Sequence, residues 1–218
     1  MQLAKSKHWR ERKKQEIARK KGKRPPYARV LIVCEGSKTE PQYFEDIRRK
    51  NRVPTAHIRI TNADGTQPRQ IVDFAEALFN ETKEFDWVFA VFDRDEHPTY
   101  HDALNKAAEL DRQLKNDERA EVRFVAAPSV PNFELWLLLH FEDTQAFFSR
   151  HEVIRKLKNH LVGYNKGMPN VYTLTEPILD TAIERSQRLK QRFSASSGTD
   201  PYTQVDQIVQ LMKSIRVP

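Results

Sequence analysis

Acidic side chains follow two apolar runs in this chain, at the points where buried strands would end. Glu35 comes directly after the run 30–34, and Asp93 and Asp95 follow the run 87–92. Because open parallel sheets place ligand-binding groups beyond the carboxyl ends of their strands, we expect the three carboxylates to converge there. Mg²⁺, which prefers oxygen ligands, would relieve their repulsion, and Mn²⁺ could take its place. A metal held in this way activates water and stabilises charge on a phosphoryl group.

Each of these motifs, and each charged residue near them, also has a simpler interpretation. An Asp-x-Asp after a strand is often a turn that caps a helix, and Glu35 with Gly36 also fits a surface turn. Glu134 is either a fourth acidic group at the same edge or a first-turn glutamate favoured by the helix dipole. Lys38 either meets a scissile phosphate or is a solvated residue at a helix start. Arg94 should point away from the metal and pair with a phosphate or a carboxylate.

The elements that must position these residues predict an α/β fold. Apolar runs predict strands at 30–34, 56–60, 87–92 and 122–126, and the segments between them predict helices at 39–50, 68–80 and 100–116. Alternating strands and helices with short connections predict a mostly parallel four-stranded sheet with helices on both faces. Ser37 or Thr39 would cap the first helix. Residues 133–218 are predicted to be helical, with Asp200 and Pro201 beginning the last helix.

The joint pattern resembles that of a Toprim domain: an apolar strand ending in Glu-Gly, a β-α-β-α interval, then an apolar strand ending in Asp-x-Asp. The resemblance implies that Glu35 acts as a general acid or base and that Asp93 and Asp95 bind Mg²⁺. The chain resembles the RloB-like family more narrowly over about residues 28–215. The motifs that carry this resemblance are Val33-Cys34-Glu35-Gly36-Ser37-Lys38-Thr39-Glu40-Pro41-x-Tyr43-Phe44, Phe92-Asp93-Arg94-Asp95-Glu96, Pro131-x-Phe133-Glu134-Leu135-Trp136-Leu137-Leu138-Leu139-His140-Phe141, Tyr164-x-Lys166 and Asp200-Pro201-x-Thr203-x-Val205.

One motif departs from the family pattern. The family usually has Ser-Asn-Pro before its Phe-Glu motif, where this chain has Ser129-Val130-Pro131. An amide that would orient a ligand is therefore missing at position 130, and Asn132 is the nearest candidate to replace it. The family is related to a component of the bacterial abortive-infection L system, and this implies an ABC- or AAA-type ATPase partner in phage defence.

The charge is concentrated at the start of the chain. Residues 1–24 carry 11 basic and two acidic side chains, whereas the whole chain has a net charge of +7. Lys13, Lys14, Lys20 and Lys21 are candidates for contacts with nucleic-acid phosphates, although the segment would also serve as a solubilising tail. We therefore expect a basic arm over residues 1–26, a Toprim-like α/β domain over 27–145 and a helical C-terminal extension over 146–218.

The composition also indicates where in the cell the protein is located. The longest apolar run, at about 133–141, is too short to span a bilayer, which needs about 20 apolar residues. No apolar stretch follows the first basic residues, so we expect no secretory signal and no membrane association. The single cysteine, Cys34, allows no internal disulfide and no cysteine-cluster zinc site, and a cytoplasmic location fits best.

These observations favour a Mg²⁺-dependent nuclease acting on DNA or RNA. A topoisomerase would need a further domain for strand passage, and a primase would need its zinc module, which one cysteine cannot build. A Walker NTPase is excluded because Gly36-Ser37-Lys38-Thr39 lacks the first glycine of that motif. The alternative is a non-catalytic nucleic-acid-binding adaptor with a degenerate Toprim fold, acting through the ATPase partner.

Overall fold

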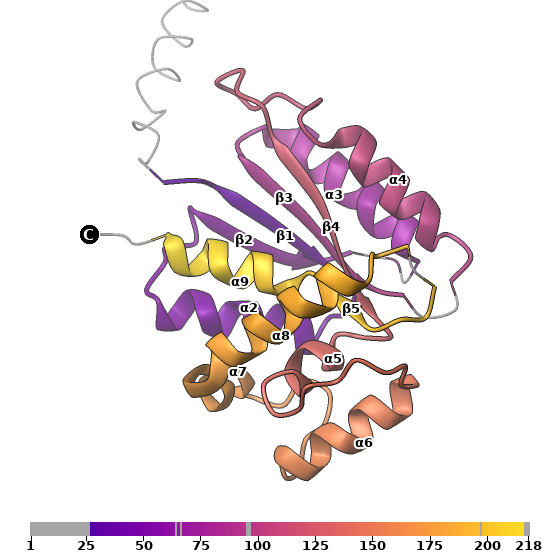
Figure 1. Cartoon of the computed structure of the whole chain (residues 1–218). Helices are drawn as coiled ribbons and strands as arrows, with labels where there is room; N and C mark the ends of the chain where they lie inside the picture. Colours follow the sequence, from indigo (N-terminus) through magenta and orange to yellow (C-terminus); the bar gives the residue numbers. More distant parts are fainter. Residues whose placement is uncertain (1–26, 64, 66, 95–96, 197, 216–218) are drawn as a thin grey trace, which may run out of the picture.

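The computed structural model describes residues 27–63, 65, 67–94, 97–196 and 198–215 (Figure 1). The expected arm with Lys13, Lys14, Lys20 and Lys21 lies outside these residues, and so does Asp95. Among the described residues, no helix is long and apolar enough to cross a membrane.

A five-stranded sheet forms the centre of the molecule, with the strand order β2-β1-β3-β4-β5. The first four strands are parallel, and the two-residue strand β5 pairs antiparallel with β4. The strands are β1 (Val30–Cys34), β2 (Ile58–Asn62), β3 (Trp87–Asp93), β4 (Arg123–Val130) and β5 (Tyr202–Thr203). The predicted mostly parallel sheet is therefore confirmed. The expected strand number of four is corrected to five, because a segment expected to be helical supplies β5.

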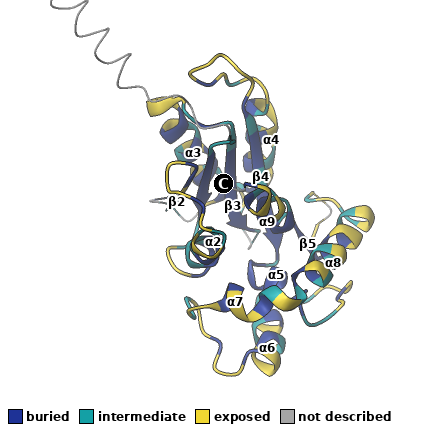
Figure 2. Ribbon diagram, turned by 90° about the vertical axis from the view of Figure 1, so that its left-hand side faces the viewer, coloured by how far each residue is buried: buried dark blue, intermediate teal, exposed yellow. Residues whose placement is uncertain are grey.

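Helices cover both faces of the sheet (Figure 1). On one face, α3 (Pro68–Thr82) packs against β1 and β3, and α4 (Tyr100–Leu110) packs against α3 and β4. On the other face, α2 (Thr39–Lys50) packs against β2, and α9 (Val205–Ser214) packs against α2 and β4. All five residues of β1 are completely buried, as expected of a parallel strand covered on both sides. Figure 2 shows the inner parts of the molecule in the dark blue of buried residues and the outer faces of the helices as exposed. This architecture is consistent with a Toprim-like fold.

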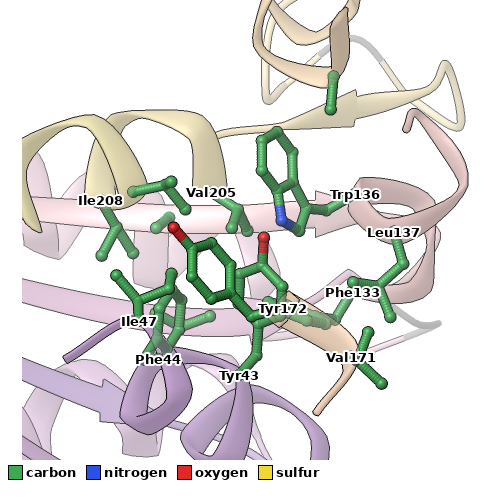
Figure 3. Packing of buried hydrophobic residues seen from close by; sticks show 14 of the residues in the cluster. Tyr43, Phe44, Ile47, Phe133, Trp136, Leu137, Val171, Tyr172, Val205 and Ile208 are labelled. Carbon is green, nitrogen blue, oxygen red and sulfur yellow. The ribbon is translucent and has the colours of Figure 1, made fainter. Parts of the chain in front are cut away.

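The chain after β4 folds back over the α2 face. Its elements are α5 (Glu134–Leu138), α6 (Arg150–His160), α7 (Val171–Thr175), the 3₁₀ turn η1 (Glu176–Ile178) and α8 (Leu179–Arg192). An aromatic cluster joins this segment to α2: the Tyr43 ring lies edge-on to Phe133 and Tyr172, with centroids 5.7 and 5.6 Å away (Figure 3). Such edge-to-face contacts stabilise a core beyond the area that they bury.

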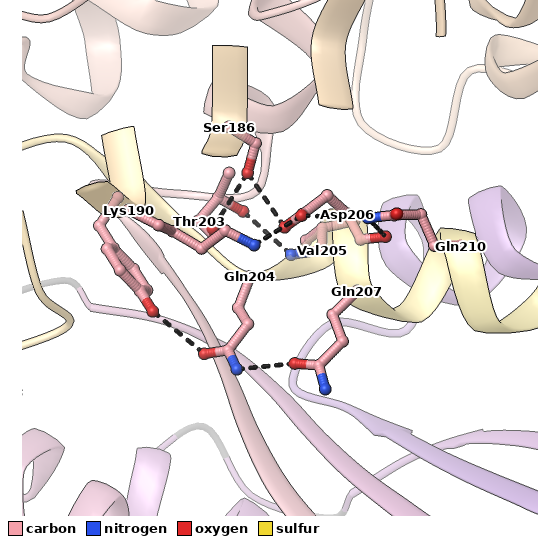
Figure 4. Close-up of polar contacts among 9 residues, drawn as sticks. Ser186, Lys190, Thr203, Gln204, Val205, Asp206, Gln207 and Gln210 are labelled. Atoms are coloured by element: carbon pink, nitrogen blue, oxygen red, sulfur yellow. Dashed lines mark hydrogen bonds and ion pairs between the residues drawn. The ribbon is translucent and has the colours of Figure 1, made fainter. Parts of the chain in front are cut away.

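A buried carboxylate fastens the last helix. Asp206 of α9 is 1% exposed and accepts hydrogen bonds from Ser186 and Lys190 of α8 (Figure 4). The Thr203 hydroxyl lies 3.0 Å from the Ser129 hydroxyl, which joins β5 to β4. These contacts hold the C-terminal segment against the strand that leads into the acidic edge of the sheet.

Several predicted boundaries were wrong for local reasons. The helix predicted to reach residue 116 ends at Leu110, because the Asp111 carboxylate accepts a hydrogen bond from the Phe124 backbone and the chain turns through Arg112 at φ 62°. The predicted strand 56–60 lies two residues later, and the strand predicted at 122–126 extends to Val130.

One predicted helix cap and one predicted helix start were also wrong, although α2 begins at residue 39 as predicted. Neither Ser37 nor Thr39 caps α2: its N-cap is Lys38, and the Thr39 hydroxyl accepts a hydrogen bond from the Gly167 backbone instead. Asp200 and Pro201 do not begin the last helix. The backbone after them is drawn into β5 by pairing with β4, so that α9 begins only at Val205.

Candidate functional site

Neighbouring parallel strands bring Glu35 and Asp93 together. In the register of β1 and β3, Cys34 lies opposite Val91, and the Glu35 backbone continues this pairing by donating to the Val91 carbonyl at 2.9 Å. The Glu35 side chain then turns towards β3, where its Oε2 accepts a hydrogen bond from the Asp93 backbone N–H at 2.9 Å. The two carboxylates predicted from the strand ends therefore lie at one edge of the sheet.

The Asp93 carboxylate is 5% exposed and is held at both oxygens. Its Oδ1 accepts a hydrogen bond from the Phe133 backbone N–H at 2.8 Å, and its Oδ2 lies 3.8 Å from Nη2 of Arg150. Phe133 follows β4, whereas Arg150 begins α6, so two later segments orient this one side chain. A buried carboxylate is stable when backbone donors and an opposite charge replace its lost hydration.

A polar pocket of about 170 Å³, called the acidic pocket below, opens beside these two carboxylates. Its floor is the turn from β1 into α2, and its walls come from β3, α6 and the loop before α7. Nine of the residues that the structure describes line it: Glu35, Gly36, Ser37, Lys38, Thr39, Glu40, Asp93, Arg150 and Lys166. Acidic and basic groups thus face the same small space, which is the composition expected of a site for a metal and an anionic ligand.

The Glu40 carboxylate lies close to the backbone of Gly36. A Cβ on Gly36 would lie 2.4 Å from Oε2 of Glu40, so a larger residue at position 36 would require the end of the Glu40 side chain to move. Glycine at this position therefore lets the first turn of α2 fold its glutamate back over the strand end.

Glu40 is a pocket residue that sequence reasoning did not select. Its side chain is 8% exposed. The pKa of this carboxyl is raised from 4.5 to about 7, chiefly by burial; the charges of Glu134 and Glu35 add to the rise, while its own backbone N–H and Lys166 oppose it. A group with such a pKa gains or loses its proton near neutral pH. The only sequence signal was its place in the motif Thr39-Glu40-Pro41.

Glu134 lies behind the pocket rather than in its wall. It is 1% exposed, and its Oε1 accepts a hydrogen bond from the Tyr164 hydroxyl at 3.2 Å. Burial, with the charge of Glu134 next, raises the Tyr164 pKa, so the phenol keeps the proton that it donates. Through this bond and its charge, Glu134 acts on Glu40 and on the loop that carries Lys166.

Two lysines reach the pocket from different segments. Lys38 precedes α2, as the sequence predicted, while Lys166 comes from the loop between α6 and α7. The loop is docked on α2 by the hydrogen bond from the Gly167 backbone to Thr39, at 3.2 Å. Gly167 has φ 81°, and a Cβ there would lie 3.2 Å from the Lys38 side chain. This close approach brings the Lys38 side chain against the loop that carries Lys166.

Comparison with known proteins adds one assignment. A sequence profile of RloB-like proteins matches residues 30–212, from the first residue of β1 into α9. The chain belongs to the RloB-like family. No curated protein and no solved structure matches it. All residues that line the pocket of this RloB-like protein lie inside the matched region.

Arg94 lies beside the pocket and does not line it. Its backbone N–H donates to the Ser129 carbonyl at 2.9 Å, and its guanidinium stacks 5.2 Å from the centre of the Tyr100 ring. The side chain therefore points away from the acidic pocket, as expected. In the part of the chain that the structure describes, its buried Nη1 has no hydrogen-bond partner, neither a carboxylate nor any other acceptor.

A second, larger cavity lies next to the acidic pocket at this edge of the sheet, and Asn132 places its amide in neither of them. Its side chain is completely buried, and neither amide atom has a hydrogen-bond partner among the residues that the structure describes. It lines neither the acidic pocket nor the larger cavity next to it. Val130 and Pro131, joined by a cis peptide bond, line the larger cavity. The departure from Ser-Asn-Pro thus makes one wall of that cavity apolar.

The donor set suits a hard divalent cation. Within the described ranges, no cluster of three or more acidic, histidine or cysteine side chains is placed to hold a metal. Glu35 and Asp93 nevertheless present carboxylate oxygens at one pocket, and Mg²⁺ in phosphoryl-transfer sites is commonly held by one or two carboxylates together with water and substrate phosphate. Asp95, two residues beyond Asp93, lies outside the described residues. Glu35 and Asp93 fit the group that the sequence predicted.

Proposed function

We propose that this RloB-like protein is a Mg²⁺-dependent nuclease that hydrolyses phosphodiester bonds of DNA or RNA. The observation that carries the proposal is the shared pocket, in which Glu35 and Asp93 face Lys38, Lys166 and Arg150. Carboxylates alone would repel a nucleic acid, and basic side chains alone would bind it without catalysing its hydrolysis. Together they support both the capture of a phosphate and the chemistry at it.

The chain contributes three functions around the phosphate. Arg150, Lys38 and Lys166 supply positive charge that attracts and orients the diester. Asp93 and Glu35 would hold the cation, which lowers the pKa of bound water and offsets charge at phosphorus. Glu40, whose pKa is raised to about 7, holds or releases a proton within the same pocket near neutral pH. Burial of Asp93 against the Phe133 N–H keeps its carboxylate in one orientation.

The test is cleavage of plasmid DNA and of tRNA by the full chain with Mg²⁺, Mn²⁺ or EDTA. Glu35→Gln and Asp93→Asn keep the hydrogen-bond acceptors seen in the structure but remove the charge, and each should lower the rate at least about 10²–10³-fold. Glu109→Gln, which removes an exposed carboxylate on α4, is the matched control and should cleave like the wild type. Cleavage by both site variants at the wild-type rate would disprove the nuclease.

The wider setting rests on family resemblance. We propose that the protein acts with an ABC- or AAA-type ATPase partner in bacterial phage defence, because a nuclease that harms its own host needs restraint. Co-expression with the proposed ATPase partner should lower plaque counts, and Glu35→Gln should restore them. Equal protection by wild type and Glu35→Gln, with no cleavage by either, would support the non-catalytic adaptor instead.

A further inference from the structure

A second, larger cavity adjoins the acidic pocket. It measures about 490 Å³, and Arg150 lines both spaces. Ligand sites for small molecules usually measure about 300–1,000 Å³, so the cavity has room for one nucleotide. A strand whose scissile phosphate lies at Glu35 and Asp93 would therefore reach this cavity with the adjoining nucleotide.

The lining of this cavity favours an anion. Arg94, Arg150 and His151 contribute basic groups, and no aspartate or glutamate is among the described residues that line it. Arg150 and His151 belong to the first turn of α6, behind the N-cap Ser149, where the helix dipole also favours negative charge.

Arg94 gives a second, independent sign of a missing ligand. Its guanidinium is held over the Tyr100 ring, yet its buried Nη1 lacks an acceptor in the part of the chain that is described. Buried donors without partners are rare because their lost hydration is not replaced. Because Arg94 lines the cavity, a phosphate bound there would supply acceptor oxygens to its guanidinium.

The rim supplies an aromatic surface. Phe147 lines the cavity and is 55% exposed. Exposed aromatic rings beside cationic grooves are the usual platforms for unpaired bases, because every base can stack on them. Val130 and Pro131 add apolar wall on which a base or sugar can pack.

We propose that this cavity, bounded by Arg94, Arg150 and Phe147, is a subsite for one unpaired nucleotide next to the scissile phosphate. The inference rests on the proposed function for its position along the strand. It implies that the substrate is single-stranded, or locally opened, at the point of cleavage. Phe147 stacks on the base, while the arginines contact the phosphate that follows.

Binding can be tested without cleavage. The full chain is titrated in EDTA with a fluorescein-labelled 12-nucleotide single strand, as DNA and as RNA, and with the DNA duplex of the same sequence, over a range of salt. Arg94→Gln should weaken single-strand binding about tenfold and lower the log–log salt slope by roughly 0.7, the value for one phosphate contact. Phe147→Ala should weaken binding about fivefold or more with an unchanged slope, because stacking releases no counterions.

Matched controls separate this subsite from general charge. Arg155→Gln removes an exposed arginine of α6 that does not line the cavity, and Leu174→Ala removes a side chain as exposed as Phe147. Both should bind like the wild type. The chain has three tryptophans of its own, so Phe147→Trp is compared with the wild type. The additional indole fluorescence of the variant should be quenched by the single strand and much less by the duplex.

The outcomes distinguish the two proposals. Wild-type affinity of both Arg94→Gln and Phe147→Ala for single strands, or no response of Phe147→Trp, overturns the subsite even if the protein cleaves nucleic acid. Weakened binding in those variants, with no metal-dependent cleavage by the wild type, retains a nucleotide-binding cavity and disproves the nuclease. Because Phe147 is exposed, its variants keep the test valid even if Arg94→Gln fails to fold.

Discussion

The Glu40 carboxyl makes the pocket sensitive to pH, and Glu40→Gln tests this. The folded chain raises the pKa of this group from 4.5 to about 7, chiefly by burying it. Between these values the folded state binds more protons than the unfolded state, so the free energy of unfolding must fall as the pH rises. From pH 5 to pH 8, the contribution of Glu40 should fall by about 2–3 kcal/mol.

That change is large beside the total stability of a domain, which is about 5–15 kcal/mol. Glutamine keeps the size and hydrogen-bonding groups of the side chain but cannot ionise. The variant should therefore lose this part of the pH dependence, and at pH 8 it should be more stable than the wild type. A destabilised charge at a pocket floor is expected where a site is built to meet a cation.

The assay is urea unfolding followed by circular dichroism at pH 5, 6, 7 and 8 in EDTA, for wild type and variant. Other titrating groups cancel in the difference between the two proteins. Glu109→Gln, on the exposed side of α4, is the control and should parallel the wild type. Lys166→Gln should shift the fall in the free energy of unfolding to higher pH, because Lys166 lowers the pKa of Glu40. Parallel profiles for wild type and Glu40→Gln would refute the reasoning.

Three further results are expected. Deleting residues 1–24 should reduce the slope of log affinity against log salt concentration for duplex binding by roughly 4.5, if the arm makes five phosphate contacts. An unchanged slope would mean that the arm serves solubility or binds a protein partner. A divalent metal at 100 Kd should stabilise the fold by about 2.7 kcal/mol, or about 5–11 °C in Tm by scanning fluorimetry, and Asp93→Asn should lose this response. Burial lowers the pKa of His140 to about 4. Stability should therefore fall by about 3 kcal/mol between pH 7 and pH 4, and in His140→Gln the fall should be smaller by that amount.

The central strands and the meeting of Glu35 with Asp93 could be predicted from the sequence. The run Val30–Cys34 is apolar throughout, and such a run forms a strand buried on both faces. Right-handed β-α-β connections place successive strands in parallel, so acids that follow two such strands end at the same edge. Local composition and general rules of topology were sufficient for this much.

Boundaries depended on contacts that the local sequence does not contain. Helix α4 ends at Leu110 because Asp111 meets the backbone of a distant strand, and Tyr202 joins the sheet because an edge of β4 is available to it. Propensity alone favoured a longer helix in the first case and an earlier helix start in the second. Pairing with a neighbour outweighed these weak local preferences.

The rest of the pocket was decided by tertiary structure. Arg150 and Lys166 reach it from segments far along the chain, and no spacing in the sequence links them to Glu35. The sequence did not single out Glu40, and it left Glu134 open between an acidic site group and a first-turn glutamate. The folding of the C-terminal segment over α2 buries both. The sequence gives the type of each side chain. Its hydration and the charges around it, and hence its pKa, are set only when distant segments pack around it.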